Sequence, residues 1–158
     1  MRVRVTCPLA LLALLPLGCS RGPLPDDALP TYPITGTLTW KGRPMDGAAI
    51  SFVPAHVPEG RRRWRVPAAS GRADVNGRYT LNTYLTGDGA PAGEYLVVVC
   101  WPEERNGRSP ALEDPSAALA PDRLKLRFAD PKKPALRANV ESRDNVIDFH
   151  LSPAEERP

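Results

Sequence analysis

The residues best suited to chemistry in this sequence are four arginines around one tryptophan: Arg61, Arg62, Arg63, Trp64 and Arg65. Guanidinium groups pair with phosphate and carboxylate groups, and an indole ring stacks on cations and planar faces. The cluster could therefore bind a glycan or a small anionic ligand. A short run of charge is more often a solvated loop with its indole folded onto the domain, and we favour that interpretation.

A second candidate is the run of Asp74, Val75, Asn76 and Gly77. Carboxylate, amide and carbonyl oxygens are calcium ligands, and Asp88 in the next loop could add another. The run lacks the closing glutamate of a helix–loop–helix calcium site. Tight turns prefer the same residue types, so we expect a turn and no metal site.

Catalytic motifs are missing from the sequence. His56 and His150 are its only histidines, and neither belongs to a zinc-binding or nucleophile motif. Cys100 ends an apolar run with no basic neighbour, which indicates a small buried side chain rather than a reactive thiol. We therefore expect no enzymatic activity and no cofactor. A hydrolase is a third hypothesis, which polar side chains gathered around His56 would support.

The N-terminus has the composition of an export signal: two arginines, an apolar run of Leu and Ala, and a small residue before Cys19. Its end, Leu17-Gly18-Cys19, resembles the lipobox of bacterial lipoproteins, although Pro16 stands where leucine is usual. The resemblance implies a leader over residues 1–18 and a lipid on Cys19. A plain secretory signal is the alternative. By the proteobacterial sorting rule, Ser20 favours the outer membrane.

Residues 19–33 contain several prolines without periodicity, which predicts an extended tether between the lipid and the domain. Arg2 and Arg4 would leave with the leader, so the remaining basic residues nearly balance the 18 acidic ones. This balance argues against a nucleic-acid partner. A membrane partner through Cys19 is expected instead.

The rest of the chain shows strand patterns separated by turns. Apolar side chains alternate with polar ones over 34–40, 48–53, 78–83, 94–100, 124–128, 136–141 and 147–151. No amphipathic helix of useful length interrupts them. Two packed antiparallel sheets are the simplest way to bury seven such faces. The sequence thus predicts an all-β sandwich over residues 34–152, followed by a tail at 153–158.

Three segments together resemble carboxypeptidase regulatory-like, transthyretin-like domains. Residues 34–54 contain the pattern G-x-P-x-x-G-A, and 70–81 follow G-x-T-D-x-x-G-x-F/Y-x-L except that Ala73 replaces the threonine. Residues 87–99 match G-A-P-x-G-x-Y-x-V-x-V, which is common in lipoproteins of this type from planctomycete-like bacteria. Residues 122–140 are also similar to that subgroup.

The resemblance implies a seven-stranded Greek-key sandwich of the prealbumin type, which usually serves as a folding or interaction module. Our first hypothesis is a non-enzymatic cell-envelope lipoprotein with an interaction or assembly module. The alternative is an extracytoplasmic glycan or small anionic-ligand binder that uses the Arg61–Arg65 loop beside the loop at 87–93. A binder should show a concave site between these loops. An assembly module should show an apolar patch or an open sheet edge.

Overall fold

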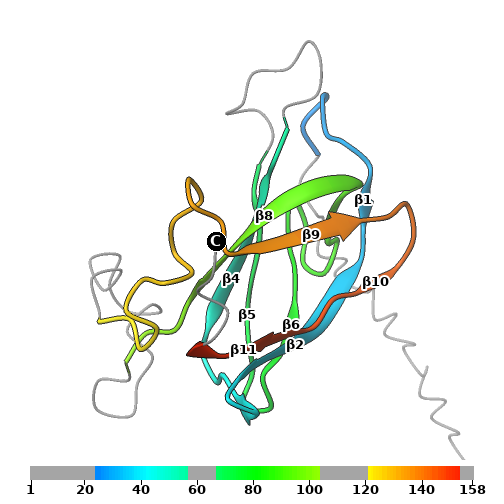
Figure 1. Cartoon of the computed structure of the whole chain (residues 1–158). Coiled ribbons are helices and arrows are strands. Elements are labelled where there is room, and N and C mark those ends of the chain that lie inside the picture. Colours follow the sequence, from blue (N-terminus) through cyan, green and yellow to red (C-terminus); the bar gives the residue numbers. More distant parts are fainter. Residues whose placement is uncertain (1–23, 57–66, 104–120, 154–158) are drawn as a thin grey trace, which may run out of the picture.

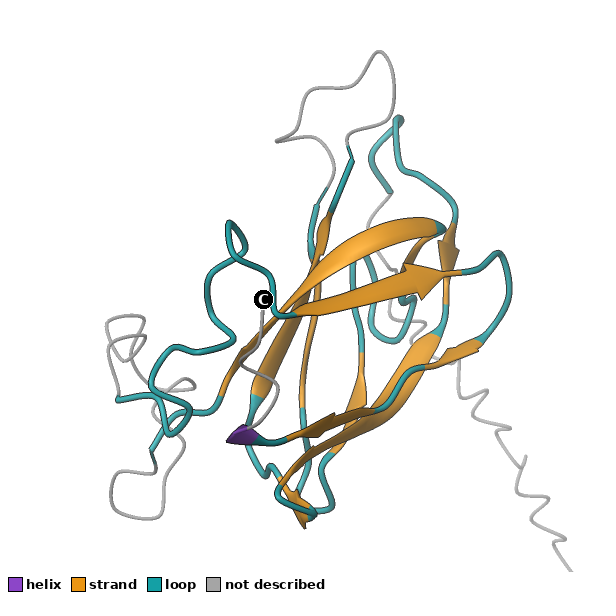
Figure 2. Ribbon diagram, in the orientation of Figure 1, coloured by secondary structure: helices purple, strands orange, loops and turns teal. Residues whose placement is uncertain are grey.

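The computed structural model describes residues 24–56, 67–103 and 121–153 of the 158-residue chain. These residues form strands, turns and loops; the one short purple segment in Figure 2 is a 3₁₀ residue at Pro153, and the described residues contain no α-helix. The prediction of an all-β fold is therefore confirmed. The predicted leader at 1–18, Cys19, the Arg61–Arg65 cluster and most of the tail lie outside the described residues.

One of the two packed sheets contains four antiparallel strands in the order β5-β4-β8-β9 (Figure 1). β4 (Ala49–Pro54) and β8 (Gly93–Cys100) form its centre. β5 (Ala69–Arg72) and β9 (Leu136–Val140) flank them. Side chains alternate between buried and more exposed positions along β8, because successive residues of a strand point to opposite faces.

The second sheet is built around β2 (Ile34–Trp40). On one side β2 pairs antiparallel with β6 (Arg78–Thr80) and β3 (Arg43–Pro44). On the other side it pairs in parallel with β10 (Asn145–Val146) and β11 (Phe149–Leu151). The offset in residue number between β2 and its partner is the same for β10 and for β11. These two strands are therefore two halves of one interrupted strand.

The expected tether is ordered at its C-terminal end. β1 (Thr31–Tyr32) pairs antiparallel with β7 (Ala90–Pro91), next to the loop that precedes β8. Leu29 N–H also bonds to the hydroxyl of Tyr84, at 3.2 Å. The folded domain therefore begins before Ile34, because these backbone groups find partners in the sandwich.

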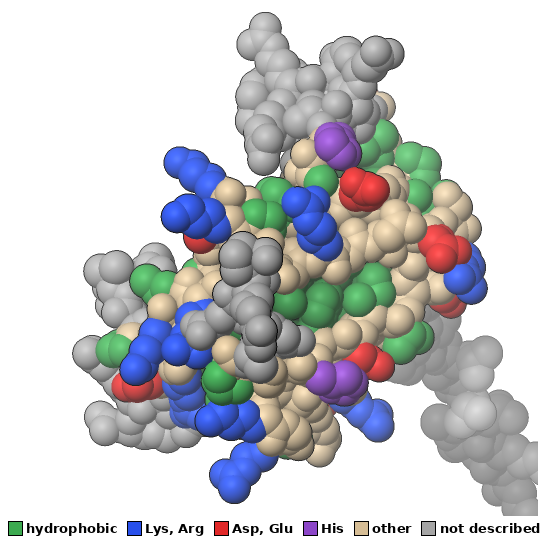
Figure 3. Space-filling view, in the orientation of Figure 1, with side chains coloured by type: hydrophobic (Ala, Val, Ile, Leu, Met, Phe, Trp, Pro, Cys, Tyr) green, Lys and Arg blue, Asp and Glu red, His purple; other side chains and the backbone are tan. Residues whose placement is uncertain are grey.

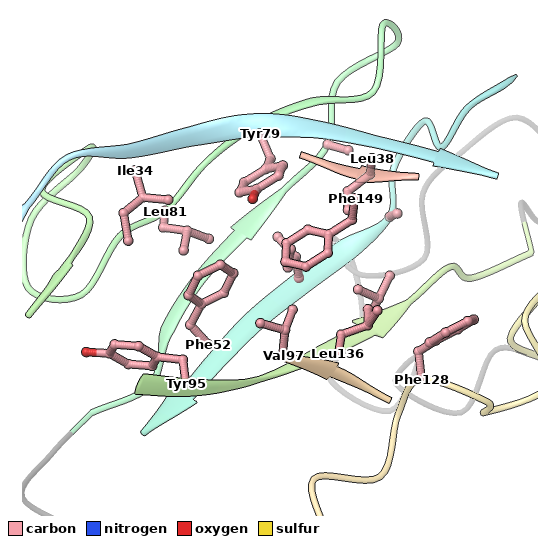
Figure 4. Close-up of a cluster of buried hydrophobic side chains, with 14 of the residues drawn as sticks. Ile34, Leu38, Phe52, Tyr79, Leu81, Tyr95, Val97, Phe128, Leu136 and Phe149 are labelled. Atoms are coloured by element: carbon pink, nitrogen blue, oxygen red, sulfur yellow. The ribbon is translucent and has the colours of Figure 1, made fainter. Parts of the chain in front are cut away.

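The hydrophobic core lies between the two sheets (Figure 4). Phe52 packs at its centre, with its ring 5.8 Å from Tyr95 and 6.2 Å from Phe149. Each of these rings stabilises the fold by about 2 kcal/mol through burial alone. Fully buried aliphatic side chains complete the core: Ile34, Leu38, Met45, Ile50, Leu81, Val97, Val99, Leu124 and Leu151.

One predicted strand is wrong. Residues 124–128 form consecutive turns rather than an edge strand. Lys125 and Leu126 adopt left-handed backbone, with φ of 54° and 61°. Leu124 and Phe128 are buried as expected, but this backbone turns Leu126 outward, where its side chain is 66% exposed. Alternating apolar residues thus indicated burial without indicating the backbone conformation.

Candidate functional site: an open side of the sandwich

The two sides of the sandwich, where the edges of its sheets meet, are built differently. On one side β5 runs through the turn at 74–77 into β6, and Ser70 pairs with Asn82 across the two segments. This connection closes that side. On the other side stand β9 and the interrupted strand β10–β11 (Figure 1). Among the described residues, β9 pairs only with β8, and β10–β11 pairs only with β2.

Within the described part of the chain, no strand pairs with the outer side of β9. The carbonyl of Glu94 accepts the N–H of the residue just past β4, so the backbone of Glu94 faces β4. Backbone N–H and C=O groups of successive residues in a strand point to opposite sides, so those of Tyr95 point to β9. The backbone groups of its partner Ala138 point to β8. The N–H and C=O groups of Arg137 and Asn139 therefore point away from the sheet, as they do in any edge strand.

The backbone of β10–β11 follows the same alternation. The N–H of Ile147 bonds to the carbonyl of Thr35, so odd-numbered residues of this strand face β2. The backbone groups of Val146, Asp148 and His150 consequently point toward the open side. Two strand edges, one from each sheet, thus border the same side of the domain, and neither has a partner among residues 24–56, 67–103 and 121–153.

Between these edges lies an apolar seam formed by Leu136, Ala138, Ile147 and Phe149. Leu136 and Phe149 are the most exposed core members, at 9% and 8%. Ala138 and Ile147 are only partly buried against the core. Figure 3 shows hydrophobic side chains reaching the surface between β9 and β10–β11. The seam is the place where the core comes closest to solvent along a free edge.

An open pocket of about 280 Å³ adjoins β9. Its lining consists of Glu94, Tyr95, Arg137, Ala138 and Asn139. The pocket therefore combines the β9 edge with one carboxylate, one guanidinium and one amide. These groups suit polar side chains of an extended segment laid along β9.

The predicted turn at Asp74 is confirmed. One carboxylate oxygen of Asp74 accepts the N–H groups of Asn76 and Arg78, each at 2.8 Å, and Gly77 has a φ of 75°. The carboxylate thus serves the turn. The described residues contain no cluster of three or more His, Cys, Asp or Glu side chains that could hold a metal ion.

Asp88 serves its own loop in the same way. Its carboxylate accepts the backbone N–H groups of Thr83, Tyr84 and Leu85 at 2.7 to 3.0 Å. A Cβ atom on Gly89 would lie 1.8 Å from the carbonyl oxygen of Tyr32. The loop at 87–93 is therefore packed against β1 and internally bonded, and its carboxylate is already committed to backbone amides.

The two histidines lie in separate surroundings. His56 is largely exposed, with its Nε2 atom 3.5 Å from Glu94 Oε2. His150 lies on the exposed face of β11, with Nδ1 3.0 Å from the hydroxyl oxygen of Thr39. Glu94 thus links His56 to the pocket beside β9. The absence of enzymatic activity stays a prediction.

Cys100 is half-buried at the end of β8 and lies near Asp122. Burial and the Asp122 carboxylate together raise the pKa of the Cys100 thiol, against a smaller opposing effect of Arg72. A raised thiol pKa favours the unreactive protonated form. The expected packing role of Cys100 is consistent with these surroundings.

The arginine cluster at Arg61–Arg65 lies outside the described residues, as does Cys19. β4 ends at Pro54, opposite Tyr95 at the start of β8, and β5 begins at Ala69. The described residues that flank this segment therefore lie at the end of the sandwich that also holds Gly93. Binding of a glycan or a small anionic ligand by Arg61–Arg65 stays a hypothesis.

Sequence reasoning missed Arg137 and Asn139 as site residues. Their outward position was visible in the alternation of 136–141. What could not be seen was that no described strand pairs with β9 on its outer side, because pairing partners are far apart in sequence. The useful signal was the short, charge-bearing strand, which is typical of sheet edges.

Searches against family models, curated proteins and solved structures find no match to this chain. Within the described ranges, no helix is long and apolar enough to cross a membrane.

Proposed function

We propose that this protein is a non-enzymatic cell-envelope lipoprotein whose β-sandwich is an interaction module, and that β9 receives an extended segment of a partner protein. The open side of the sandwich carries this proposal. Edge strands are templates for an added strand, whose main chain supplies affinity and whose alternate side chains supply specificity. Anchoring at Cys19 and export follow from the sequence pattern and belong to the proposal.

We further infer that the fold is of the prealbumin, transthyretin-like type. Two features support this inference: one sheet has the order β5-β4-β8-β9, and the other places β2 between β6 and the parallel strand β10–β11. Taken with β10 and β11 as one strand, these are the seven main strands. The short pairs made by β1, β3 and β7 are additions to that plan.

The open side favours an assembly module over a ligand-binding protein. The loop at 87–93, half of the proposed ligand site, uses its carboxylate and its close packing for its own structure. The pocket instead adjoins β9, where Arg137 and Asn139 point their backbone groups outward. A polypeptide partner can satisfy these groups, whereas a small anion would leave most of them to water.

Site-specific photo-crosslinking in the producing cells tests this function. A photoreactive residue would replace Asn139 at the free edge, and a matched one would replace Ser70 on the closed side. We expect Asn139 to yield a discrete adduct with a polypeptide, and Ser70 to yield none. Adducts of equal intensity at both positions, or none at Asn139, would contradict the proposal.

A further inference from the structure

A second surface lies at the end of the sandwich where β8 terminates. We call residues 122–128 the basic tip. Asp122, Leu124 and Phe128 are buried, whereas Arg123, Lys125, Leu126 and Arg127 are exposed. The three buried side chains fix the segment to the domain, and the three cations and one leucine between them lie in solvent.

The basic tip is held firmly in this conformation. The Asp122 carboxylate accepts the N–H of Trp101 at 2.7 Å and the N–H of Leu126 at 2.8 Å. The carbonyl of Phe128 accepts the N–H of Val99 at 2.9 Å. The two bonds to Asp122 hold its carboxylate inside the fold, beneath the turn that presents the cations.

The conformation of Leu126 is costly on its own terms. A leucine in left-handed backbone is strained, and its side chain gains nothing from burial because it stands in solvent. A polar or glycine residue would satisfy this turn with less strain. An apolar side chain at this exposed, hydrogen-bonded position points to a contact with something apolar outside the domain.

The cations of the tip continue onto the turn between β2 and β3. The ring of Trp40 lies 6.4 Å from that of Phe128, and the indole N–H of Trp101 donates to the carbonyl of Asp46 at 2.8 Å. These contacts bring the exposed Lys41 and Arg43 to the same end. Figure 3 shows Lys and Arg side chains gathered toward the lower left of the molecule, over these segments.

Two tryptophans border the same surface beneath cationic side chains. The Arg123 guanidinium lies 4.7 Å from the ring centre of Trp101, and the Lys41 ammonium lies 5.9 Å from that of Trp40. Both indoles are half-buried. Tryptophan with lysine and arginine is the composition that favours the boundary between lipid headgroups and acyl chains.

We propose that the basic tip docks on a membrane surface that carries anionic lipid, with Leu126 inserted among the headgroups and the surrounding cations against lipid phosphates. Charge complementarity supplies most of the attraction, at about fivefold in affinity for each cation near the surface. The exposed leucine favours a bilayer over a soluble polyanion, which offers it no apolar environment. The proposal depends neither on strand pairing at β9 nor on a lipid at Cys19.

Vesicle sedimentation with residues 24–158, which contain every strand described above, tests the proposal. The probes are phosphatidylcholine vesicles with and without about one part in four of phosphatidylglycerol. We expect binding only to the anionic vesicles, weakened by salt. Lys125→Ala with Arg127→Ala should lower the affinity by about 25-fold, about fivefold for each cation removed.

The decisive variant is Leu126→Asn, because asparagine accepts left-handed backbone and removes the apolar tip without straining the turn. We expect anionic-vesicle affinity to fall about tenfold with unchanged denaturation. Val146→Asn, which replaces a valine 76% exposed on β10, is the matched control and should bind as wild type. The proposal would be overturned if Leu126→Asn bound anionic vesicles as tightly as wild type does. It would also be overturned if dextran sulfate alone fully displaced the protein from the vesicles, or if the wild type bound no vesicles at all. Crosslinking at Asn139 would be unaffected by any of these results.

Discussion

One carboxylate oxygen of Asp148 accepts both the backbone N–H and the hydroxyl of Thr37, each at 2.7 Å. A side chain thus takes the place of a backbone carbonyl in the ladder between β2 and its parallel neighbour. This substitution separates β10 from β11 without changing their register. The free edge on this side of the sandwich is therefore interrupted midway, whereas β9 offers a continuous one.

Replacing Asp148 tests this arrangement. Asp148→Ala leaves the Thr37 N–H without its acceptor, and we expect a loss of about 1 to 2 kcal/mol in the free energy of unfolding. Asp144→Ala, in the exposed turn just before β10, is the control and should change stability by less than about 0.5 kcal/mol. Urea denaturation measures both. Equal effects of the two changes would contradict a structural role for Asp148.

The close contact between Gly89 and β1 gives a second prediction. A Cβ on Gly89 would meet the Tyr32 carbonyl oxygen at 1.8 Å, and its φ of 75° disfavours any side chain. We expect Gly89→Ala to lower the free energy of unfolding by about 3 kcal/mol or more. The alanine would be strained at this φ, and the backbone of Tyr32 would also have to move away from the new Cβ. Gly42→Ala shares the φ of 75° but meets nothing within 4 Å, so it should cost only about 1 kcal/mol. A similar loss in both variants would show that β1 does not pack on this loop.

Alkaline pH should destabilise the fold through its buried tyrosines. Burial, with a smaller effect of Tyr84, raises the pKa of Tyr95 from 10.0 to about 12, and burial with Asp148 raises that of Tyr79 further. Both groups stay protonated in the native state while they ionise in the unfolded chain. The contribution of Tyr95 is therefore complete below pH 10 and is lost as pH rises from 10 through 12, and the loss for Tyr79 extends to still higher pH.

Urea denaturation across this alkaline range measures the effect. For Tyr95 alone the loss should approach about 2 to 3 kcal/mol, since one pKa unit corresponds to about 1.4 kcal/mol. Tyr95→Phe removes a hydroxyl that donates to the Pro91 carbonyl at 2.8 Å, so it lowers stability at neutral pH. The same variant should show a shallower fall above pH 10. An unchanged alkaline slope would place the ionising group elsewhere.

The all-β class could be predicted because alternating apolar residues and glycine-rich turns are local signals. The turn at 74–77 and the burial of Phe52, Val97 and Leu151 follow from the same signals. The left-handed backbone at Leu126 could not be predicted. It depends on the Asp122 carboxylate, which accepts the N–H of Leu126 four residues further along the chain. The ordering of Thr31 and Tyr32 likewise depends on a partner strand far away in sequence.

The candidate site was less predictable than the fold. Arg137 and Asn139 alternate with apolar neighbours as they would in any half-exposed strand. Their role depends on β9 lying at the end of its sheet and on the parallel placement of β10–β11 against β2. Such long-range pairings decide which strand of a sandwich has a free edge.

Backbone amide exchange along β9 tests the central claim that this edge is open. The measurement is native-state exchange by NMR on residues 24–158 without a partner. The account predicts an alternation, with fast exchange at Arg137 and Asn139 and strong protection at Ala138 and Val140, which face β8. Strong protection at all four amides would show that the edge is already covered, and it would contradict strand addition at β9.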